Sequence, residues 1–209
     1  MVVQEPDKMQ APSPSPTVRM PAAKRREQLL QVARQVLAHR GFYETTMAEI
    51  ADSAGVTKPV LYQHFESKRD LYGAVLQDIG ARLRDAVIDA ASIGDTPREQ
   101  VANGFQAYLE FVEQDTDGFQ ILFSGTSRQD GEWASITAEV EHSIAEGIAG
   151  LIDVPEITAA HRLALAHGLF GLAEGMMRYW QSDQQRELDR DDLLNDLVTL
   201  AWGGLRGLE

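Results

Sequence analysis

Residues 55–71 of the chain form the stretch GVTKPVLYQHFESKRDL, which decides the fold of its N-terminal third. Thr57 is a favourable N-cap residue, and Pro59 falls in the first turn of the helix that follows, where its missing N–H does no harm. Leu61 and Phe65 are four residues apart, so they are predicted to face the core together. The outward face of this short helix then carries a cation, a phenol and an amide, at Lys58, Tyr62 and Gln63.

The residues just before this stretch predict another short helix. Thr46 is an N-cap residue with Glu49 three positions later, which is the pattern of a capping box. A helix is therefore expected over residues 47–54, with Ile50 turned inward and Gly55 as its stop. Two short helices that meet across a glycine-containing turn form a helix-turn-helix, and the polar groups on the second helix suit the phosphates and base edges of DNA.

The N-terminal flank divides into an arm and a helix. Residues 1–21 contain repeated proline, which excludes a helix and leaves little to bury, so a disordered or extended arm is expected. A helix is predicted over residues 22–40, because apolar residues recur on one face and Gly41 follows as a stop. Its first turn carries three cations that form either a solvated face or contacts to phosphate: Lys24, Arg25 and Arg26.

Downstream of residue 66 the pattern predicts helices throughout. The apolar segment 118–123 could form a strand, but no partner strand is found, so a short helix is expected there, followed by a polar loop over 124–131. The predicted fold class is all-α with about nine helices: a helix-turn-helix domain is expected over 22–68 and a larger domain over 69–209. The remaining predicted helices span about 67–91, 97–114, 132–152, 156–181 and 190–205.

Charge is divided unevenly along the chain. The 209 residues carry a formal net charge of −13. Residues 1–70 hold ten basic and eight acidic residues, a balance of +2, whereas residues 71–209 hold nine basic and 24 acidic residues, a balance of −15. The acidic part would repel a phosphate backbone, so only the N-terminal third can approach DNA at low electrostatic cost.

Composition and spacing exclude several other classes. The chain has no cysteine, so it has no disulfide and no thiolate metal site. No apolar run reaches the roughly 18 residues that a membrane span needs, and the N-terminus lacks the apolar region of a secretory signal, so the cytoplasm is the expected location. His161 and His167 lack the i, i+4 spacing of a helical metal pair, and no glycine-rich phosphate loop or serine elbow occurs. We expect no catalytic site, metal or cofactor.

The stretch quoted above, together with Gly41-Phe42 and residues 45–51 (TTMAEIA), resembles the DNA-binding signature of the TetR family of bacterial repressors. The resemblance in sequence covers about residues 24–75. Over the rest of the chain, only the number, length and order of the predicted helices resemble the family. Many members carry glycine at the position of Pro59. It implies a transcription regulator that binds a palindromic operator as a dimer. Tyr62 could instead be a half-buried ring, and His64 could pack between helices. The implied DNA contacts are Thr46, Thr57, Lys58, Pro59, Tyr62, Gln63, His64 and Lys68.

The same resemblance implies that the larger domain senses a small molecule and dimerises. The last two long helices would pair with their two-fold mates as a four-helix bundle, with no membrane partner. Small residues in the first of these helices permit close helix–helix approach. They include Ala164, Gly168, Gly171 and Gly175.

Large apolar side chains with few polar neighbours cluster in the middle helices, which suits a long apolar effector. Residues 41–76 also resemble actinobacterial members of the family that control lipid and fatty-acid genes, which implies a fatty acyl or acyl-CoA effector. A drug-like compound or another small metabolite is the alternative, and a helical ligand carrier that does not bind DNA is a more remote one. The candidate pocket residues are Phe105, Tyr108, Phe111, Phe123, Trp133, His167, Phe170 and Met176.

Overall fold

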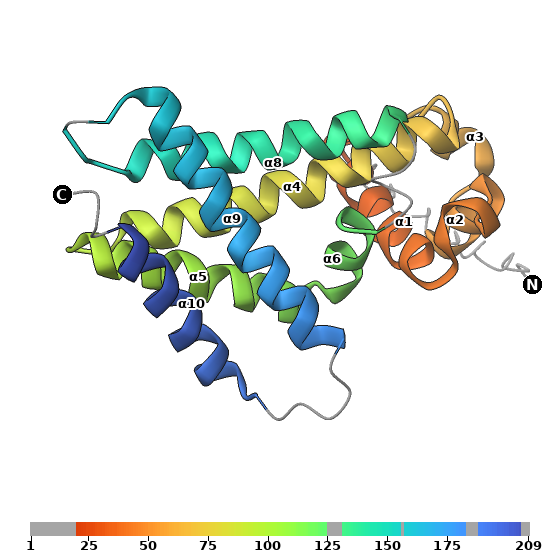
Figure 1. The fold of residues 1–209 in the computed structure, drawn as a ribbon. Helices are drawn as coiled ribbons and strands as arrows, with labels where there is room; N and C mark the ends of the chain where they lie inside the picture. The colour runs from red at the N-terminus through yellow and green to blue at the C-terminus, as the bar shows by residue number, and fades with distance from the viewer. Residues whose placement is uncertain (1–19, 125–130, 156, 183–187, 206–209) are drawn as a thin grey trace, which may run out of the picture.

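The computed structural model describes residues 20–124, 131–155, 157–182 and 188–205. Within these ranges the chain forms nine helices and no strand, which confirms the all-α prediction (Figure 1). The helix labels follow Figure 1, in which the numbering passes from α6 to α8. The helices are α1 (Ala22–Glu44), α2 (Met47–Ser53), α3 (Lys58–Tyr62), α4 (Lys68–Ser92), α5 (Pro97–Gln114), α6 (Thr116–Leu122), α8 (Gly131–Leu151), α9 (Ala159–Ser182) and α10 (Arg190–Leu205).

Helices α1, α2 and α3 form a small unit at one end of the molecule (Figure 1). None of the three can bury its apolar face alone, so each contributes side chains to a shared core. Leu29 of α1, Ile50 of α2 and Leu61 of α3 are all fully buried there, and Phe65 closes the core directly after α3. The inward positions predicted for Ile50, Leu61 and Phe65 are confirmed.

Helix α1 changes direction at Gly41. The backbone of Gly41 has φ 76° and ψ 167°, a conformation that is essentially restricted to glycine. The straight part of α1 therefore ends where the sequence predicts, and one further turn follows to Glu44. The buried Thr45 then donates a 2.8 Å hydrogen bond from its hydroxyl to the Gly41 carbonyl, which fixes the chain before α2 begins.

The larger unit is built along α4. This 25-residue helix is capped by Ser67, whose hydroxyl accepts a hydrogen bond from the Asp70 N–H, and it packs against both α5 and α8. Helix α8 runs beside α4 over most of its length (Figure 1). A Cβ atom at Gly80 would lie 2.3 Å from a methyl carbon of Val140, so glycine is what permits this close approach. Helices α9 and α10 complete the unit.

Besides the extra turn at the end of α1, the predicted and observed boundaries differ clearly at α9, which begins at Ala159 rather than at residue 156. The hydroxyl of Thr158 accepts a 3.3 Å hydrogen bond from the His161 N–H and so caps this helix. The short segment predicted as a helix over 118–123 is confirmed as one and begins slightly earlier, after Asp115. Residues 1–19 of the expected arm and residues 125–130 of the expected loop lie outside the described residues. No helix of the described part is long and apolar enough to cross a membrane.

Candidate nucleic-acid interface and effector cavity

The outward face of the helix-turn-helix is formed by α3 and the residues at its two ends. Lys58 and Pro59 occupy its first turn, and both are exposed. Tyr62 is 50% exposed although it is a large aromatic residue, and Gln63 beside it is also exposed. Thr57 forms no side-chain capping bond, so its hydroxyl is not engaged by its own helix. The polar groups that the sequence places on this face are therefore brought together on one accessible surface.

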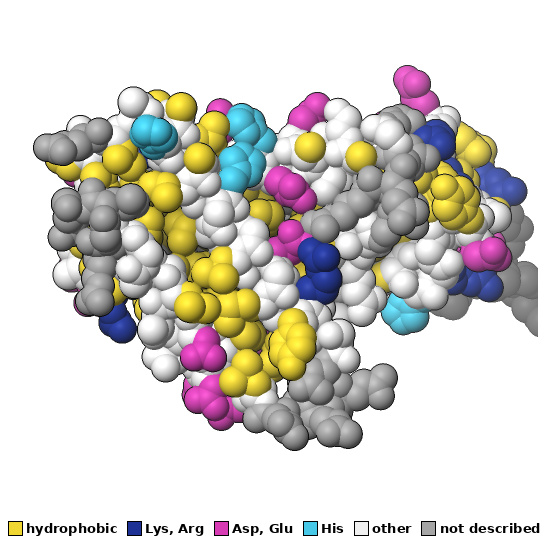
Figure 2. Space-filling view, in the orientation of Figure 1, with side chains coloured by type: hydrophobic (Ala, Val, Ile, Leu, Met, Phe, Trp, Pro, Cys, Tyr) yellow, Lys and Arg dark blue, Asp and Glu magenta, His cyan; other side chains and the backbone are white. Residues whose placement is uncertain are grey.

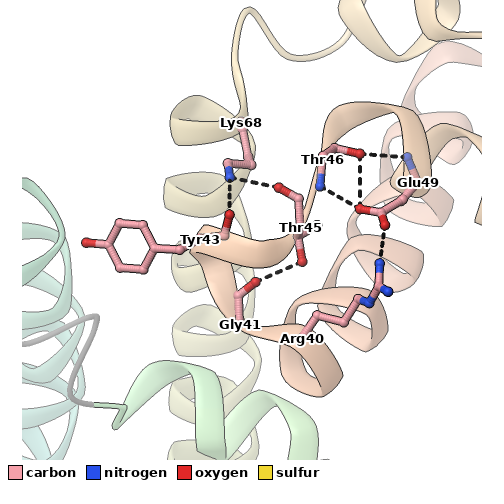
Figure 3. A network of polar contacts seen from close by, with 7 residues as sticks. All are labelled: Arg40, Gly41, Tyr43, Thr45, Thr46, Glu49 and Lys68. Carbon is pink, nitrogen blue, oxygen red and sulfur yellow. Dashed lines mark hydrogen bonds and ion pairs between the residues drawn. The ribbon is translucent and has the colours of Figure 1, made fainter.

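Helix α2 is held by the predicted capping box (Figure 3). The Thr46 hydroxyl accepts a hydrogen bond from the Glu49 N–H at 3.3 Å, and the Glu49 carboxylate accepts one from the Thr46 N–H at 2.8 Å. Arg40 of α1 forms an ion pair with the same carboxylate. The hydrogen bonds from Thr46, and then the charge of Arg40, hold the pKa of Glu49 below its usual value. Thr46 thus stays exposed at a fixed position beside α3.

Lys68 lies at the first position of α4, and its ammonium group is turned toward the end of α1 (Figure 3). It donates hydrogen bonds of 2.7 Å to the carbonyls of Phe42 and Thr45, and it lies 4.2 Å from the centroid of the Phe42 ring. A cation is favoured at this point because the last carbonyls of a helix form its negative end. Lys68, which the resemblance implies near a DNA phosphate, therefore joins α4 to the α1–α2 connection in this structure.

His64 is half-buried at the edge of the same surface. Its backbone carbonyl accepts a 3.4 Å hydrogen bond from Arg26, whose guanidinium lies 4.4 Å from the centroid of the Phe65 ring. Of the three cations in the first turn of α1, Arg26 is thus used partly within the domain, and Arg25 donates a hydrogen bond to Gln28. Lys24 is exposed.

The larger domain contains an apolar cavity of about 310 Å³. This volume lies at the small end of the range for sites that hold small molecules. Among the predicted pocket residues, Phe105 and Tyr108 of α5 and Phe170 of α9 line it. The lining is completed by Val87, Ala91, Pro97, Gln100, Val101, Gly104, Ile148, Leu151, Ile152, Asp153, Val154, Leu169, Ala173, Trp202 and Leu205.

The other five predicted pocket residues do not line this cavity. Trp133 is fully buried where α1 meets α4, with its ring centroid 4.3 Å from that of Phe42 and 4.6 Å from that of Tyr72. Phe123 packs 6.1 Å from Phe170, behind the cavity wall. Apolar character alone could not separate core from lining, because both consist of the same residue types. The remaining three lie elsewhere in the domain: Phe111 near Arg82, Met176 against the core, and His167 beside His142.

An ion cluster connects the unit of α1, α2 and α3 to the larger one, and the sequence patterns did not point to it. The Asp115 carboxylate accepts hydrogen bonds from Arg34 of α1 at 2.5 Å and from Arg82 of α4, and it also caps α6 through the Gly118 N–H at 2.9 Å. Asp115 and Arg34 are both largely buried. Asp115 lies between α5 and α6 and binds side chains of α1 and α4, so this single carboxylate joins four helices. The earlier turns of α5 line the cavity.

Comparison with known proteins agrees with this geometry. Residues 29–75 match the bacterial regulatory proteins of the tetR family, and residues 97–204 match the tetracyclin repressor-like C-terminal domain.

One relative, the HTH-type transcriptional activator FasR of Mycolicibacterium smegmatis, is 35% identical over 188 residues, which cover 90% of this chain and 85% of FasR. A TetR-like regulator from Rhodococcus sp. RHA1 has 31% identity and a TM-score of 0.67, and the match covers 90% of this chain and all of that one. The fatty acid degradation regulator FadR of Bacillus halodurans has a TM-score of 0.73 at 20% identity, covering 87% of this chain and 96% of FadR, and so shares the fold.

The chain belongs to the TetR family of bacterial regulatory proteins, and it is a DNA-binding transcription regulator rather than an enzyme.

Proposed function

We propose that the protein binds a palindromic operator as a homodimer, with α3 of each protomer in the major groove. The observation that carries this proposal is the accessible face of α3, where Lys58, Tyr62 and Gln63 project from a helix whose other side is locked into the core. A rigid support favours readout of base edges, since the side chains are held in register with the groove. The two half-sites would then lie in successive major grooves, about 34–36 Å apart.

The proposed contacts divide into those that position the protein and those that read sequence. Lys58 and Pro59 would meet base edges, where a lysine suits guanine and an apolar ring suits the thymine methyl group. Gln63 could read an adenine or bind a phosphate. The remaining proposed contacts are to phosphate, from the hydroxyls of Thr46, Thr57 and Tyr62 and from His64. Lys68 would act mainly by fixing α4 against the α1–α2 connection.

The proposed dimer forms through the last two long helices, α9 and α10. Along α9, Gly168, Gly171 and Gly175 are exposed with open space above each Cα, and Tyr179 is 66% exposed. Leu200 of α10 is 58% exposed. Hydrophobic side chains gather over this face of the molecule (Figure 2). Exposed apolar groups beside exposed glycines suit close approach of a second copy of the same helices.

We further propose that the cavity takes a long apolar effector, a fatty acyl group or an acyl-CoA. Its lining is mostly aliphatic and aromatic, which favours an alkyl chain. The fatty acid degradation regulator FadR shares the fold. The acyl proposal takes its chemical class from the fatty acids whose degradation that protein regulates. A drug-like compound or another small metabolite is the alternative. A ligand carrier that does not bind DNA is disfavoured by the accessible Lys58 and Tyr62.

The effector would act on DNA binding through α4. This helix begins against the DNA-binding domain through the buried Leu71 and Tyr72, and its far end lines the cavity through Val87 and Ala91. Packed helices move as units, so a ligand that prefers one position of α4 changes the spacing of the two recognition helices. A tenfold change in operator affinity needs about 1.4 kcal/mol of coupling.

Two experiments test the proposal in sequence. Selection from a random DNA pool should return an inverted repeat; a pool without any two-fold symmetric site would contradict the dimeric operator complex. Affinity for the selected site is then measured with and without fatty acids and acyl-CoAs of increasing chain length. An operator affinity that no chain length alters would rule out the acyl effector and favour the alternative ligand classes.

A further inference from the structure

Two histidines on neighbouring helices face each other outside both the DNA-binding surface and the cavity. The Nδ1 atom of His142, in α8, lies 3.4 Å from the Nε2 atom of His167, in α9. The two rings are stacked, with an interplanar angle of 26°. Both residues are exposed, and Figure 2 shows histidine side chains on the surface over α8 and α9. The pair therefore lies on the surface of the single protomer.

The third group beside this pair is Glu146, one turn after His142 on the same helix. Its carboxylate oxygen lies 3.6 Å from Nε2, the other ring nitrogen of His142. A carboxylate at this position favours the proton on Nε2, which leaves the lone pair of Nδ1 directed toward His167. Histidine ligands of metal ions commonly have a carboxylate on their second nitrogen in this way.

The separation of the two nitrogens matches one edge of a tetrahedral metal site. Zinc–nitrogen bonds of about 2.0–2.1 Å at the tetrahedral angle place two ligand nitrogens roughly 3.3–3.4 Å apart. We propose that His142 and His167 bind a late first-row divalent ion, such as Zn²⁺, Ni²⁺ or Cu²⁺, which imidazole ligands suit. No cluster of three or more metal-ligating side chains is placed to hold an ion among the described residues, so water completes the coordination and the ion is exchangeable.

An ion at this position would clamp α8 to α9. Both helices line the effector cavity further along their length, through Ile148 on α8 and through Leu169 and Phe170 on α9. Metal binding would therefore hold two walls of the cavity at a fixed distance. Metal binding by the two histidines can therefore be tested without knowing the effector or the operator sequence.

The experiment uses the full chain without a histidine tag. Zinc(II) and nickel(II) are titrated into the protein by calorimetry, and thermal unfolding is followed at the same metal concentrations. We expect saturable binding of one ion per protomer and a rise in Tm, because the ion binds the folded state. Magnesium, which prefers oxygen ligands, should give neither effect.

Matched variants decide whether the histidine pair is the site. His142→Gln and His167→Gln should each weaken zinc binding at least tenfold, and Glu146→Gln should weaken it about tenfold. His39→Gln is the control, since His39 is an exposed histidine on α1, and it should bind as the unaltered chain does. Either of two results would overturn the proposal: no saturable binding, or unchanged binding in the His142 and His167 variants. In both cases the 3.4 Å contact is only a hydrogen bond between the two rings.

Discussion

The guanidinium of Arg34 donates a 2.5 Å hydrogen bond to the carboxylate of Asp115, which lies 81 residues later in the chain. Arg34 belongs to the DNA-binding domain, and Asp115 lies between α5 and α6 of the larger domain. Both side chains are largely buried, so the pair is shielded from the water that weakens surface ion pairs. Arg82 approaches the same carboxylate from α4. Because α5 lines the cavity and ends just before Asp115, the pair gives a second connection, beside α4, between the cavity and the DNA-binding domain.

Asp115→Asn tests this connection. Asparagine still caps a helix, so α6 keeps its N-cap while Arg34 loses its counterion. We expect a loss of about 3 kcal/mol in the free energy of unfolding, measured by urea denaturation at fixed protomer concentration. Arg82→Gln is the control: that side chain is 43% exposed, so its loss should cost less than about 1 kcal/mol. If both variants lowered the free energy of unfolding equally, the buried Arg34–Asp115 pair would stabilise the fold no more than an exposed ion pair does.

Lys58→Ala tests the recognition surface. If Lys58 reads a guanine, the variant should lose about 1–3 kcal/mol of operator binding and accept other bases at that position. The measurement is operator affinity for the selected site and for each single-base change in it. Arg84→Ala removes the same charge from α4, far along the chain from α3, and should leave base preference unaltered. A uniform loss across all sites would instead assign Lys58 to a phosphate contact.

Lys68→Met separates a structural role from a role at the DNA. The ammonium group bonds two carbonyls at 2.7 Å, so its removal leaves acceptors unpaired and should lower the free energy of unfolding by about 1–3 kcal/mol. Operator affinity, measured where the variant is fully folded, should retain the same dependence on salt, since no phosphate contact is lost. A shallower salt dependence would place Lys68 at the DNA backbone after all.

Sequence patterns predicted those parts of the structure that local chemistry decides. The capping box of Thr46 and Glu49 and the stop at Gly41 depend on residues within a few positions, so a single sequence contains the whole signal. The Arg34–Asp115 pair depends on how α1 meets α6, which no local pattern encodes. Lys68 shows the same limit within the predicted motif. It lies at the start of α4, as the motif predicts, but the direction of its side chain depends on carbonyls 23 and 26 residues earlier in the chain. The pair His142 and His167 escaped notice because its members lie on different helices.

Stability should depend on pH through Glu49. Hydrogen bonds from Thr46 lower the pKa of this carboxyl in the folded state, so its contribution is present above the unfolded value near 4.5 and is lost as pH falls through the lower folded value. Glu49→Gln should therefore lower Tm at pH 7, and the difference from the unaltered chain should shrink as pH drops below about 4. Thermal melts between pH 3 and pH 7 measure this. A Tm difference that stays constant over that interval would show that the charge of Glu49 does not stabilise α2.

Gly171→Leu tests the proposed dimer face without disturbing the protomer. A Cβ atom at Gly171 would meet nothing within 4 Å, and leucine favours a helix over glycine by up to about 1 kcal/mol, so the fold of each protomer should be kept. If α9 packs closely against its two-fold mate, the added bulk should raise the dimer dissociation constant at least tenfold, or about 1.4 kcal/mol. Sedimentation equilibrium measures this constant directly.

Gly150→Leu is the control for the Gly171 variant, because Gly150 of α8 also has open space but lies outside the proposed interface. It should dimerise as the unaltered chain does. The Gly171 variant should also lose operator affinity, since a two-fold site needs both recognition helices at once. If Gly171→Leu dimerises as tightly as the unaltered chain, close packing of α9 is not how two copies meet, and another face of the larger domain must hold the two DNA-binding domains together.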